Sequence, residues 1–332
     1  MTCGRSPSVT SPELAPGAPA GGGAAPTPLP PLGRITVVVA SRDRRAELAR
    51  SLPRHEASVI LVDNGSTDGT VASVRETQPD VMVVSLPVNR GAPARNIGVR
   101  LAVSPYVAFA DDDSWWEVGS LARAVEVLDA HPRVAVVAAR VQVGTAQVDD
   151  PICAAMAAAP LGRAVDLPGP SVLGFLACGV VVRRSAFLEV GGFDDVVFFG
   201  GEEERVALDL ASAGWGLAYV PELVVHHHPS ASRDSRGRAL LEERNRLLVT
   251  VMRRPWGVVA WGVVRALRSG PAGRAGVRAA VRRSPSALRA RRRVPARVEA
   301  ARRALDLAGA ASVTPQPLSS LTAEGIGIGS GP

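Results

Sequence analysis

The strongest constraint on the fold is a regular alternation, between residues 34 and 110, of short β-branched runs with segments of helical spacing. Each run is almost continuously apolar, as strands are when helices cover both faces of a parallel sheet. The alternation predicts an α/β fold with an open, mostly parallel sheet flanked by helices. Such sheets bind ligands at the carboxyl ends of their strands. The expected strands are residues 35–40, 59–62, 81–84 and 106–110, and the expected helices are 42–52, 70–76 and 92–103.

The pattern loosens beyond residue 113 and gives way to a basic C-terminal region. Residues 146–170 are rich in Ala, Pro and Gly and predict an irregular segment, whereas an amphipathic, Arg-rich helix is expected over 236–253. Within the domain, the further expected elements are helices at 116–130 and 202–213 and strands at 134–143, 179–182, 217–220 and 223–227. The chain is therefore divided into a disordered leader (1–33), an α/β domain (34–232), an amphipathic helical extension (233–268) and an Arg-rich, largely disordered tail (269–332).

Charge is distributed unevenly along the chain. The net charge is +7, but residues 265–303 contain 13 arginines and one acid, Glu299, so this segment carries +12 and the remainder −5. The segment lacks interleaved aromatic residues, and no nucleic-acid partner is expected. Next to Trp256 and Trp261 it instead favours peripheral contact with an anionic membrane surface.

Composition limits the class of protein further. At 46% hydrophobic residues the chain can bury a sizeable core. No uninterrupted apolar run reaches the ~20 residues of a membrane-spanning helix, and residues 1–31 lack the apolar stretch of a secretory signal. Cys3, Cys153 and Cys178 are too far apart for a disulfide scaffold or a zinc cluster. We therefore expect a cytoplasmic protein, any membrane contact being peripheral and on the inner face of the cell membrane.

Polar and acidic residues follow two of the predicted strands directly. Asp63 and Asn64 follow the second strand, in a composition that an ordinary turn also favours. Asp111, Asp112 and Asp113 follow the fourth strand, and three adjacent carboxylates exceed what a turn requires. Mg²⁺ typically binds one or two carboxylates together with substrate phosphates. The second cluster therefore predicts a site for a metal ion and a diphosphate.

Two further clusters carry candidate chemical groups. Residues 202–204 are three glutamates that open a predicted helix, where the helix dipole stabilises acids. Three in a row exceed this need, so one of them is a candidate general base. In the run His226, His227 and His228, successive side chains of a strand alternate faces, which argues against a three-histidine zinc site. A single histidine is expected to complete a carboxylate-based metal site.

Six segments occur in a characteristic order between residues 34 and 229. They are residues 35–45 (ITVVVASRDRR), 62–70 (VDNGSTDGT), 89–98 (NRGAPARNIG), 107–116 (VAFADDDSWW), 191–193 (GGF) and 201–215 (GEEERVALDLASAGW). Together they resemble the family 2 glycosyltransferases, which have the GT-A fold. The resemblance implies transfer of a sugar from a nucleoside-diphosphate sugar to an acceptor hydroxyl, with inversion at the anomeric carbon and assistance from Mg²⁺ or Mn²⁺. The implied acceptor is a saccharide, a lipid-linked molecule or a small molecule, in the synthesis of cell-surface polysaccharide, glycolipid or a glycosylated metabolite.

The resemblance also implies roles for individual residues. Glu203 matches the catalytic base, and Glu202 matches the acid that precedes it. The metal ligands are implied to be Asp113, Asp111 and His227. The residues implied to bind the nucleotide sugar are Ser41, Arg42, Asp63, Asn64, Arg95, Asn96, Asp111 and Asp112.

Two departures from the family pattern leave the identity of the base open. Glu203 replaces the usual aspartate, and Arg205 stands where many members have a second aspartate, so Glu202 remains an alternative base. Two other functions remain alternatives. A nucleotidyltransferase acting on sugar phosphates would require a Gly-rich loop and a lysine, which the N-terminal region does not supply. A non-catalytic, membrane-associated nucleotide-sugar-binding protein would not need all three acidic clusters.

Overall fold

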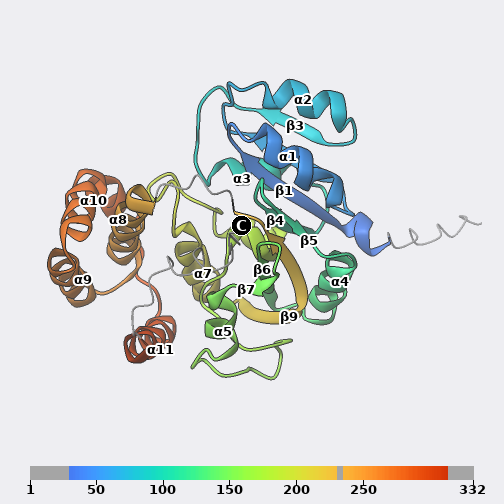
Figure 1. The fold of residues 1–332 in the computed structure, drawn as a ribbon. Helices are drawn as coiled ribbons and strands as arrows, with labels where there is room; N and C mark the ends of the chain where they lie inside the picture. Colours follow the sequence, from blue (N-terminus) through green and yellow to red (C-terminus); the bar gives the residue numbers. More distant parts are fainter. Residues whose placement is uncertain (1–29, 230–234, 313–332) are drawn as a thin grey trace, which may run out of the picture.

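The computed structural model describes residues 30–229 and 235–312 and contains a nine-stranded sheet covered by helices (Figure 1). Its first half has four parallel strands in the order β3-β2-β1-β4, as the alternation predicts. From β1 the chain adds β2 and then β3 on one side, and it then adds β4 on the other side of β1. The direction in which strands are added to the sheet therefore reverses between β1 and β4. The elements of this half are β1 (Ile35–Ser41), α1 (Arg45–Ser51), β2 (Val59–Asp63), α2 (Thr70–Thr77), β3 (Met82–Ser85), α3 (Ala94–Leu101) and β4 (Tyr106–Ala110).

The second half of the sheet is mixed. The strand β8 runs antiparallel to both β4 and β6, whereas β6 and β9 are parallel. The strands are β5 (Ser114–Trp116), β6 (Val134–Val143), β7 (Val148–Asp149), β8 (Val180–Arg183) and β9 (Gly216–His227). Two short strands were expected at 217–220 and 223–227, but β9 is continuous. The break between the two predicted strands is a bulge opposite Ala139 and Arg140, which places the exposed Pro221 outside the regular pairing.

Four helices complete the domain: α4 (Ser120–Ala130), α5 (Pro151–Ala157), α6 (Arg184–Glu189) and α7 (Glu202–Ser212). Helix α5 interrupts the segment predicted to be irregular. It has helix-start signals, because Pro151 occupies the first turn and the Asp150 carboxylate accepts a hydrogen bond from the backbone N–H of Ile152 at 2.9 Å. Short 3₁₀ turns lie at η1 (Pro31–Arg34), η2 (Leu52–Arg54) and η3 (Ala177–Gly179). Residues 31–33 of the expected disordered leader thus have defined structure, and residues 1–29 lie outside the described residues.

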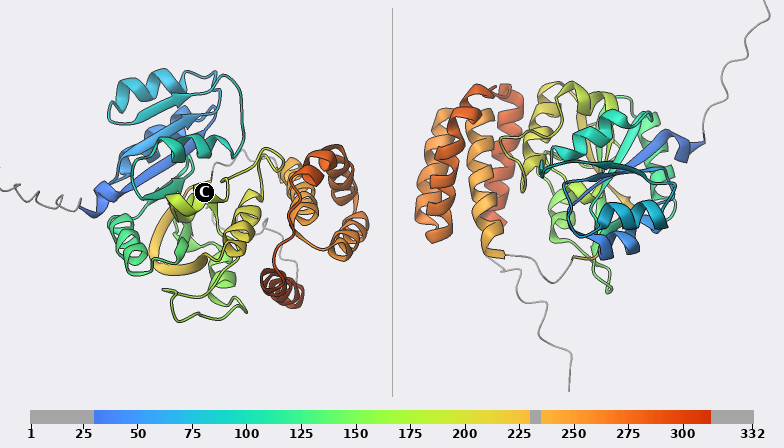
Figure 2. Two further views of the ribbon diagram at one scale, coloured as in Figure 1. Left: turned by 180° about the vertical axis from the view of Figure 1, so that it is seen from behind. Right: turned by 90° about the horizontal axis from the view of Figure 1, so that it is seen from above.

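The C-terminal region contradicts the prediction of a largely disordered tail from residue 269. It contains α8 (Ser235–Arg253), α9 (Trp256–Arg268), α10 (Pro271–Arg289) and α11 (Ala296–Ser312), which lie beside the sheet domain (Figures 1 and 2). A stripe of small residues on α10 escaped the sequence analysis: Gly273, Gly276, Ala280 and Ala287 are buried. A Cβ at Gly276 would lie 3.0 Å from the Cβ of Glu243, so this glycine permits close packing of α10 on α8. Residues 313–332 of the expected tail lie outside the described residues.

Many of the C-terminal arginines are structural. The Arg253 guanidinium binds both carboxylate oxygens of Asp209 on α7, at 2.5 and 2.9 Å. Arg254 is buried and binds both oxygens of Glu299, each at 3.1 Å. These bonds, together with a second apolar cluster that includes Val197, Leu208 and Leu247, join the C-terminal helices to the domain. Some of the arginines that suggested disorder therefore form ion pairs that hold the C-terminal helices in place.

We expect Glu299→Ala to lower the free energy of unfolding by about 3 kcal/mol, because it leaves the buried Arg254 without its bidentate partner. Denaturant unfolding of the full chain measures this. The matched control is Glu126→Ala, which removes an exposed pair with Arg123 and should cost no more than about 0.5 kcal/mol. Equal costs for the two substitutions would show that the C-terminal helices do not contribute to the stability of the domain.

Candidate active site

The candidate site lies at the carboxyl ends of β1 and β4, where the chain changes direction across the sheet. Open α/β sheets bind ligands at this position. Ser41, the last residue of β1, donates a hydrogen bond from its hydroxyl to Oδ2 of Asp112, 3.0 Å away in the loop after β4. The Ser51 hydroxyl donates to the backbone carbonyl of Asp112 at 2.8 Å. Burial and the neighbouring charges of Asp111 and Asp113 raise the pKa of Asp112 to about 7.

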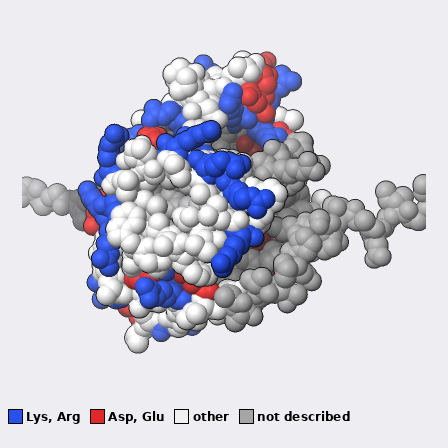
Figure 3. All heavy atoms as spheres, turned by 90° about the vertical axis from the view of Figure 1, so that its left-hand side faces the viewer, with Lys and Arg blue, Asp and Glu red and all other residues white. Residues whose placement is uncertain are grey.

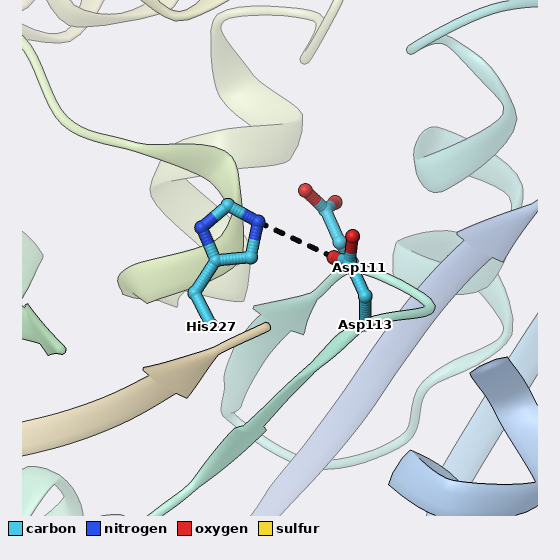
Figure 4. Close-up of side chains that lie close together, drawn as sticks. All are labelled: Asp111, Asp113 and His227. Carbon is cyan, nitrogen blue, oxygen red and sulfur yellow. Dashed lines mark ion pairs between the residues drawn. The ribbon is translucent and has the colours of Figure 1, made fainter. Parts of the chain in front are cut away.

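The two flanking aspartates meet a histidine from the far end of the chain. Asp111, Asp113 and His227 each offer one ligand atom, and these atoms lie within 4.8 Å of one another (Figure 4). His227 ends β9, and its Nε2 is 3.3 Å from Oδ1 of Asp113. The backbone N–H of His228 donates to the carbonyl of Asp113 at 2.8 Å, which fixes the two segments relative to each other. The structure therefore brings together the three residues that the resemblance implied as metal ligands.

The neighbouring histidines face the other way, as strand alternation predicts. The rings of His226 and His228 both pack on Trp115, with centroids 5.6 and 4.7 Å away. The guanidinium of Arg54 lies over the same indole, 4.0 Å from its centroid. The imidazole of His226 pairs with Glu117 and not with the aspartate cluster. Of the three histidines, His227 is the one placed at the cluster.

Arg95 connects the aspartate cluster to the glutamates of α7. It is buried, and its guanidinium lies 2.5 Å from Oδ1 of Asp111 and 3.9 Å from Oε1 of Glu202. Burial alone would lower the pKa of Arg95, but the charges of Asp111 and Glu202 raise it. The side chain is therefore a fixed positive charge between the two acidic groups.

Glu202, which is buried, and Glu203, which is partly exposed, form an acidic pair next to this arginine. Glu202 is 4% exposed, and burial raises its pKa. Glu203 accepts a hydrogen bond from the backbone N–H of Ala177 at 3.2 Å, and burial and the charge of Glu202 raise its pKa to about 8. Burial raises the pKa of the Cys178 thiol, and the charges of Asp111, Asp113 and Glu203 raise it further. The sequence context of Cys178 did not indicate that these charges act on it.

The third glutamate, Glu204, contacts the C-terminal helices. Glu204 binds Arg302 of α11 at 2.7 Å, so it fastens a C-terminal helix. Arg205, the departure from the family pattern, is buried and pairs with Asp194 at 3.1 Å and with Asp209 at 2.6 Å. The glutamate cluster is therefore divided between the candidate site and the packing of the C-terminal helices.

Asp63 ends β2 beside Ser41 and is 1% exposed. Its Oδ2 accepts hydrogen bonds from the Ser66 backbone N–H at 3.2 Å and from the Ser85 hydroxyl at 3.3 Å. Its Oδ1 has no hydrogen-bond partner among the described residues. A buried carboxylate oxygen without a donor is suited to bind a ligand N–H or O–H group. Arg42, in the loop after β1, is half exposed and lies 3.4 Å from Asp43.

Two asparagines that the resemblance implied as donor-binding residues are engaged with the backbone. Asn64 donates from Nδ2 to the Gly91 carbonyl at 3.1 Å and accepts from the Arg90 N–H at 2.7 Å. Asn96 donates to the Phe193 carbonyl at 2.7 Å and accepts from the Phe193 N–H at 3.0 Å. Both amides therefore hold loops that border the site.

The loop of residues 194–201, which leads into Glu202, is held from two sides. The Phe198 carbonyl accepts from the Ala92 N–H at 2.7 Å, and any Cβ at Gly91 would lie 2.3 Å from that oxygen. On the other side, Nδ2 of Asn245 on α8 donates to the Phe199 carbonyl at 2.6 Å. Phe198 itself has a φ of 69°, a conformation that side chains other than glycine rarely adopt. Asn245 is a positioning residue that no sequence signal revealed.

Comparison with known proteins shows similarity to glycosyltransferases. A sequence profile described as glycosyl transferase family 2 matches residues 36–191. The chain is 33% identical over 227 residues to the pre-mycofactocin glycosyltransferase of Mycobacterium tuberculosis, in an alignment that covers 62% of this chain and 46% of that protein. Residues 36–191 of this chain are therefore similar to glycosyltransferase family 2. Because the profile ends at residue 191, the glutamate pair and His227 lie beyond the matched segment.

A second relative and two solved structures are consistent with this assignment. Identity to the N-acetylglucosaminyl-diphospho-decaprenol L-rhamnosyltransferase of Mycobacterium tuberculosis is 29% over 208 residues, covering 53% of this chain and 67% of that protein. A TarS fragment from S. aureus in complex with UDP-GlcNAc has a TM-score of 0.52 at 14% identity and covers 82% of this chain and 88% of its own. GalNAc-T7 with UDP, GalNAc and Mn²⁺ has a TM-score of 0.54 at 15% identity, with 72% and 51% coverage. These structures show that the chain has the GT-A fold. It spans about half the length of the pre-mycofactocin relative.

Proposed function

We propose that this chain transfers a sugar from a nucleoside-diphosphate sugar to an acceptor hydroxyl, with inversion at the anomeric carbon. The observation that carries the proposal is the meeting of Asp111, Asp113 and His227 at the sheet edge, with the Glu202–Glu203 pair joined to it by Arg95. In this arrangement the nucleotide lies along the ends of β1 and β2, where the free Oδ1 of Asp63 accepts a hydrogen bond from it. The diphosphate then lies at the aspartate cluster.

The donor set fits a divalent cation. Two carboxylates and one imidazole are common ligands of divalent metals, and carboxylate-rich sites suit hard cations such as Mg²⁺ and Mn²⁺. When bound, the cation would neutralise negative charge that develops on the leaving diphosphate. One solved structure that shares the fold was determined with UDP and Mn²⁺, which supports this part of the proposal.

Glu203 is the proposed general base. Transfer breaks the bond between the anomeric carbon and the diphosphate oxygen and forms a bond from that carbon to the acceptor oxygen. The acceptor proton passes to Glu203, and the nucleoside diphosphate leaves with the electron pair of the broken bond. A base is most effective when its pKa lies near the working pH, as that of Glu203 does at about 8. The fixed charge of Arg95 and the N–H of Ala177 hold the two carboxylates in place.

The named activities of the relatives support the reaction class. One is a pre-mycofactocin glycosyltransferase, and another is an L-rhamnosyltransferase whose name specifies a decaprenol-linked substrate. We therefore propose a lipid-linked, saccharide or small-molecule acceptor, in the synthesis of envelope glycoconjugates or a glycosylated metabolite.

A panel of nucleoside-diphosphate sugars tests the proposal. Thermal unfolding is recorded with each donor, with and without Mn²⁺ or Mg²⁺, and transfer is followed by release of the nucleoside diphosphate. We expect one nucleotide class to raise the melting temperature in the presence of metal and to be turned over when acceptor is added. Release of pyrophosphate would instead indicate a nucleotidyltransferase. Binding without turnover on any acceptor class would indicate a non-catalytic binding protein.

A further inference from the structure

The outer face of α9 is apolar and uncovered by the described residues. Trp256 and Trp261 are 57% and 65% exposed, and Val264 and Leu267 are also exposed. The spacing of Trp256, Ala260, Val264 and Leu267 places them along one stripe of the helix. The remaining described tryptophans are buried or half-buried, so both exposed tryptophans of the described chain lie on this helix.

Helix α10 packs against α9 and extends this surface. It exposes Val281 and Leu288. Figure 3 looks onto this side of the molecule and shows an uncharged area bordered by basic side chains. Residues 256–293 contain no aspartate or glutamate. The exposed arginines that border the area are Arg265, Arg268, Arg274, Arg278, Arg282 and Arg289.

The arginines of the C-terminal helices fall into two groups. Arg253, Arg254 and Arg302 point inward and pair with acids, as described above. Arg268, Arg278 and the other exposed arginines of α10 make no side-chain hydrogen bond or ion pair with the residues that the structure describes. An ordinary protein surface mixes both signs of charge. Arg265 is the exception among the bordering arginines, because it pairs with Glu243 at 3.7 Å. An apolar stripe bordered by mostly unpaired positive charge instead fits a partner that offers both hydrocarbon and many anionic groups.

We propose that the face formed by α9 and α10 docks on the surface of an anionic lipid bilayer, with Trp256 and Trp261 in the interfacial region. Tryptophan favours this region, and basic residues are attracted to anionic headgroups. Within the described residues, no helix is long and apolar enough to cross a membrane, so α9 lies in the plane of the surface. A second copy of the chain fits the face less well, because pairing two such faces would bring their arginine borders together. This docking is independent of the proposed reaction.

Sedimentation with vesicles tests the docking. The full chain is mixed with neutral vesicles of phosphatidylcholine or with anionic vesicles that also contain roughly 30% phosphatidylglycerol. Each mixture is measured at low and at high salt. We expect binding to the anionic vesicles only, weakened as salt screens the attraction. Tryptophan emission should shift to shorter wavelength on binding. The triple substitution Arg268→Glu, Arg278→Glu and Arg282→Glu should weaken vesicle binding by at least about tenfold, and Trp256→Ala with Trp261→Ala should abolish the spectral shift.

The control variant carries Arg50→Glu and Arg75→Glu, which reverse the charge of two exposed arginines in the first half of the domain. It should bind vesicles as the parent does. Circular dichroism and the melting temperature confirm that each variant is folded. Three results would overturn the proposal: no vesicle binding, equal loss in the control and the triple variant, or equal binding to neutral vesicles. A dimer in solution that the tryptophan substitutions dissociate would assign the face to a second copy and overturn it as well. Turnover on a soluble acceptor should be the same in all these variants.

Discussion

Glu203→Gln is expected to lower turnover by about 10²–10⁴-fold, the usual contribution of a general base, while donor affinity stays nearly unchanged. Glutamine has almost the same shape and can still accept the N–H of Ala177, but it cannot take the acceptor proton. Steady-state kinetics with the preferred donor give turnover, and calorimetric titration gives affinity. In the proposed reaction the ionised form of Glu203 takes the acceptor proton, so turnover of the parent should fall as pH drops below about 8.

The neighbouring glutamates provide the comparisons for this variant. Glu204→Gln changes a residue that pairs with Arg302 and should keep turnover within about threefold of the parent. A larger loss in Glu202→Gln than in Glu203→Gln would transfer the role of base to Glu202.

Stability gives an independent check on the same variant. The pKa of Glu203 is raised from 4.5 to about 8, so the folded state holds a proton that the unfolded state has lost between these values. The stability contributed by this proton is complete below pH 4.5 and is lost as pH rises through about 8. Glutamine has no charge to bury. Glu203→Gln should therefore melt about 2–6 °C above the parent at pH 8.5 and at the same temperature at pH 4.5.

Asp113→Ala is expected to remove the effect of divalent cations on donor binding, weakening metal-dependent affinity by about 100-fold, or roughly 2.8 kcal/mol. Asp113 is the most buried of the three clustered residues and has its backbone fixed by His228. Calorimetric titration of the nucleoside-diphosphate sugar, with Mn²⁺ and with a chelator, measures the change.

Two further variants make this result interpretable. Asp113→Asn preserves shape and should show a similar loss without disturbing the fold, as judged by circular dichroism. Asp80→Ala removes an exposed carboxylate remote from the cluster and should bind as the parent does. Unchanged metal-dependent affinity in both Asp113 variants would exclude the cluster as the cation site.

Much of the fold could be predicted from local sequence. The strands β1, β2 and β4 are buried β-branched or apolar runs, and each lies within one residue of its expected bounds. The position of the aspartates follows from the rule that a parallel sheet gathers its loops at one edge. Strand alternation predicted that one histidine of the run of three would complete the site, the family resemblance pointed to His227, and the structure places that residue beside Asp111 and Asp113.

What the sequence could not predict depends on contacts between distant segments. The helices α10 and α11 were missed because an arginine-rich segment has the composition of a solvated tail. Only the structure shows that small residues of α10 are buried, with Gly276 against α8. Asn245 lies 46 residues from Phe199, and nothing in its own neighbourhood marks it as the residue that holds that carbonyl. Cys178 is a lone thiol in sequence, and only the fold places it in η3, where the charges of Asp111, Asp113 and Glu203 act on its pKa.

The first half of the sheet is built from one uninterrupted stretch of chain, residues 35–110, in which every strand pairs in parallel. This makes it a natural unit for exchange between related proteins. The junction to be preserved includes the antiparallel pairing of β4 with β8, the contact of Arg95 with Glu202, the Ala92 N–H bound to Phe198 and the two bonds between Asn96 and Phe193. A chimera that imports a foreign stretch with a residue larger than glycine at position 91 would displace the Phe198 carbonyl. Recombination that keeps these contacts can therefore exchange the four parallel strands while retaining the glutamates and the basic face of the parent.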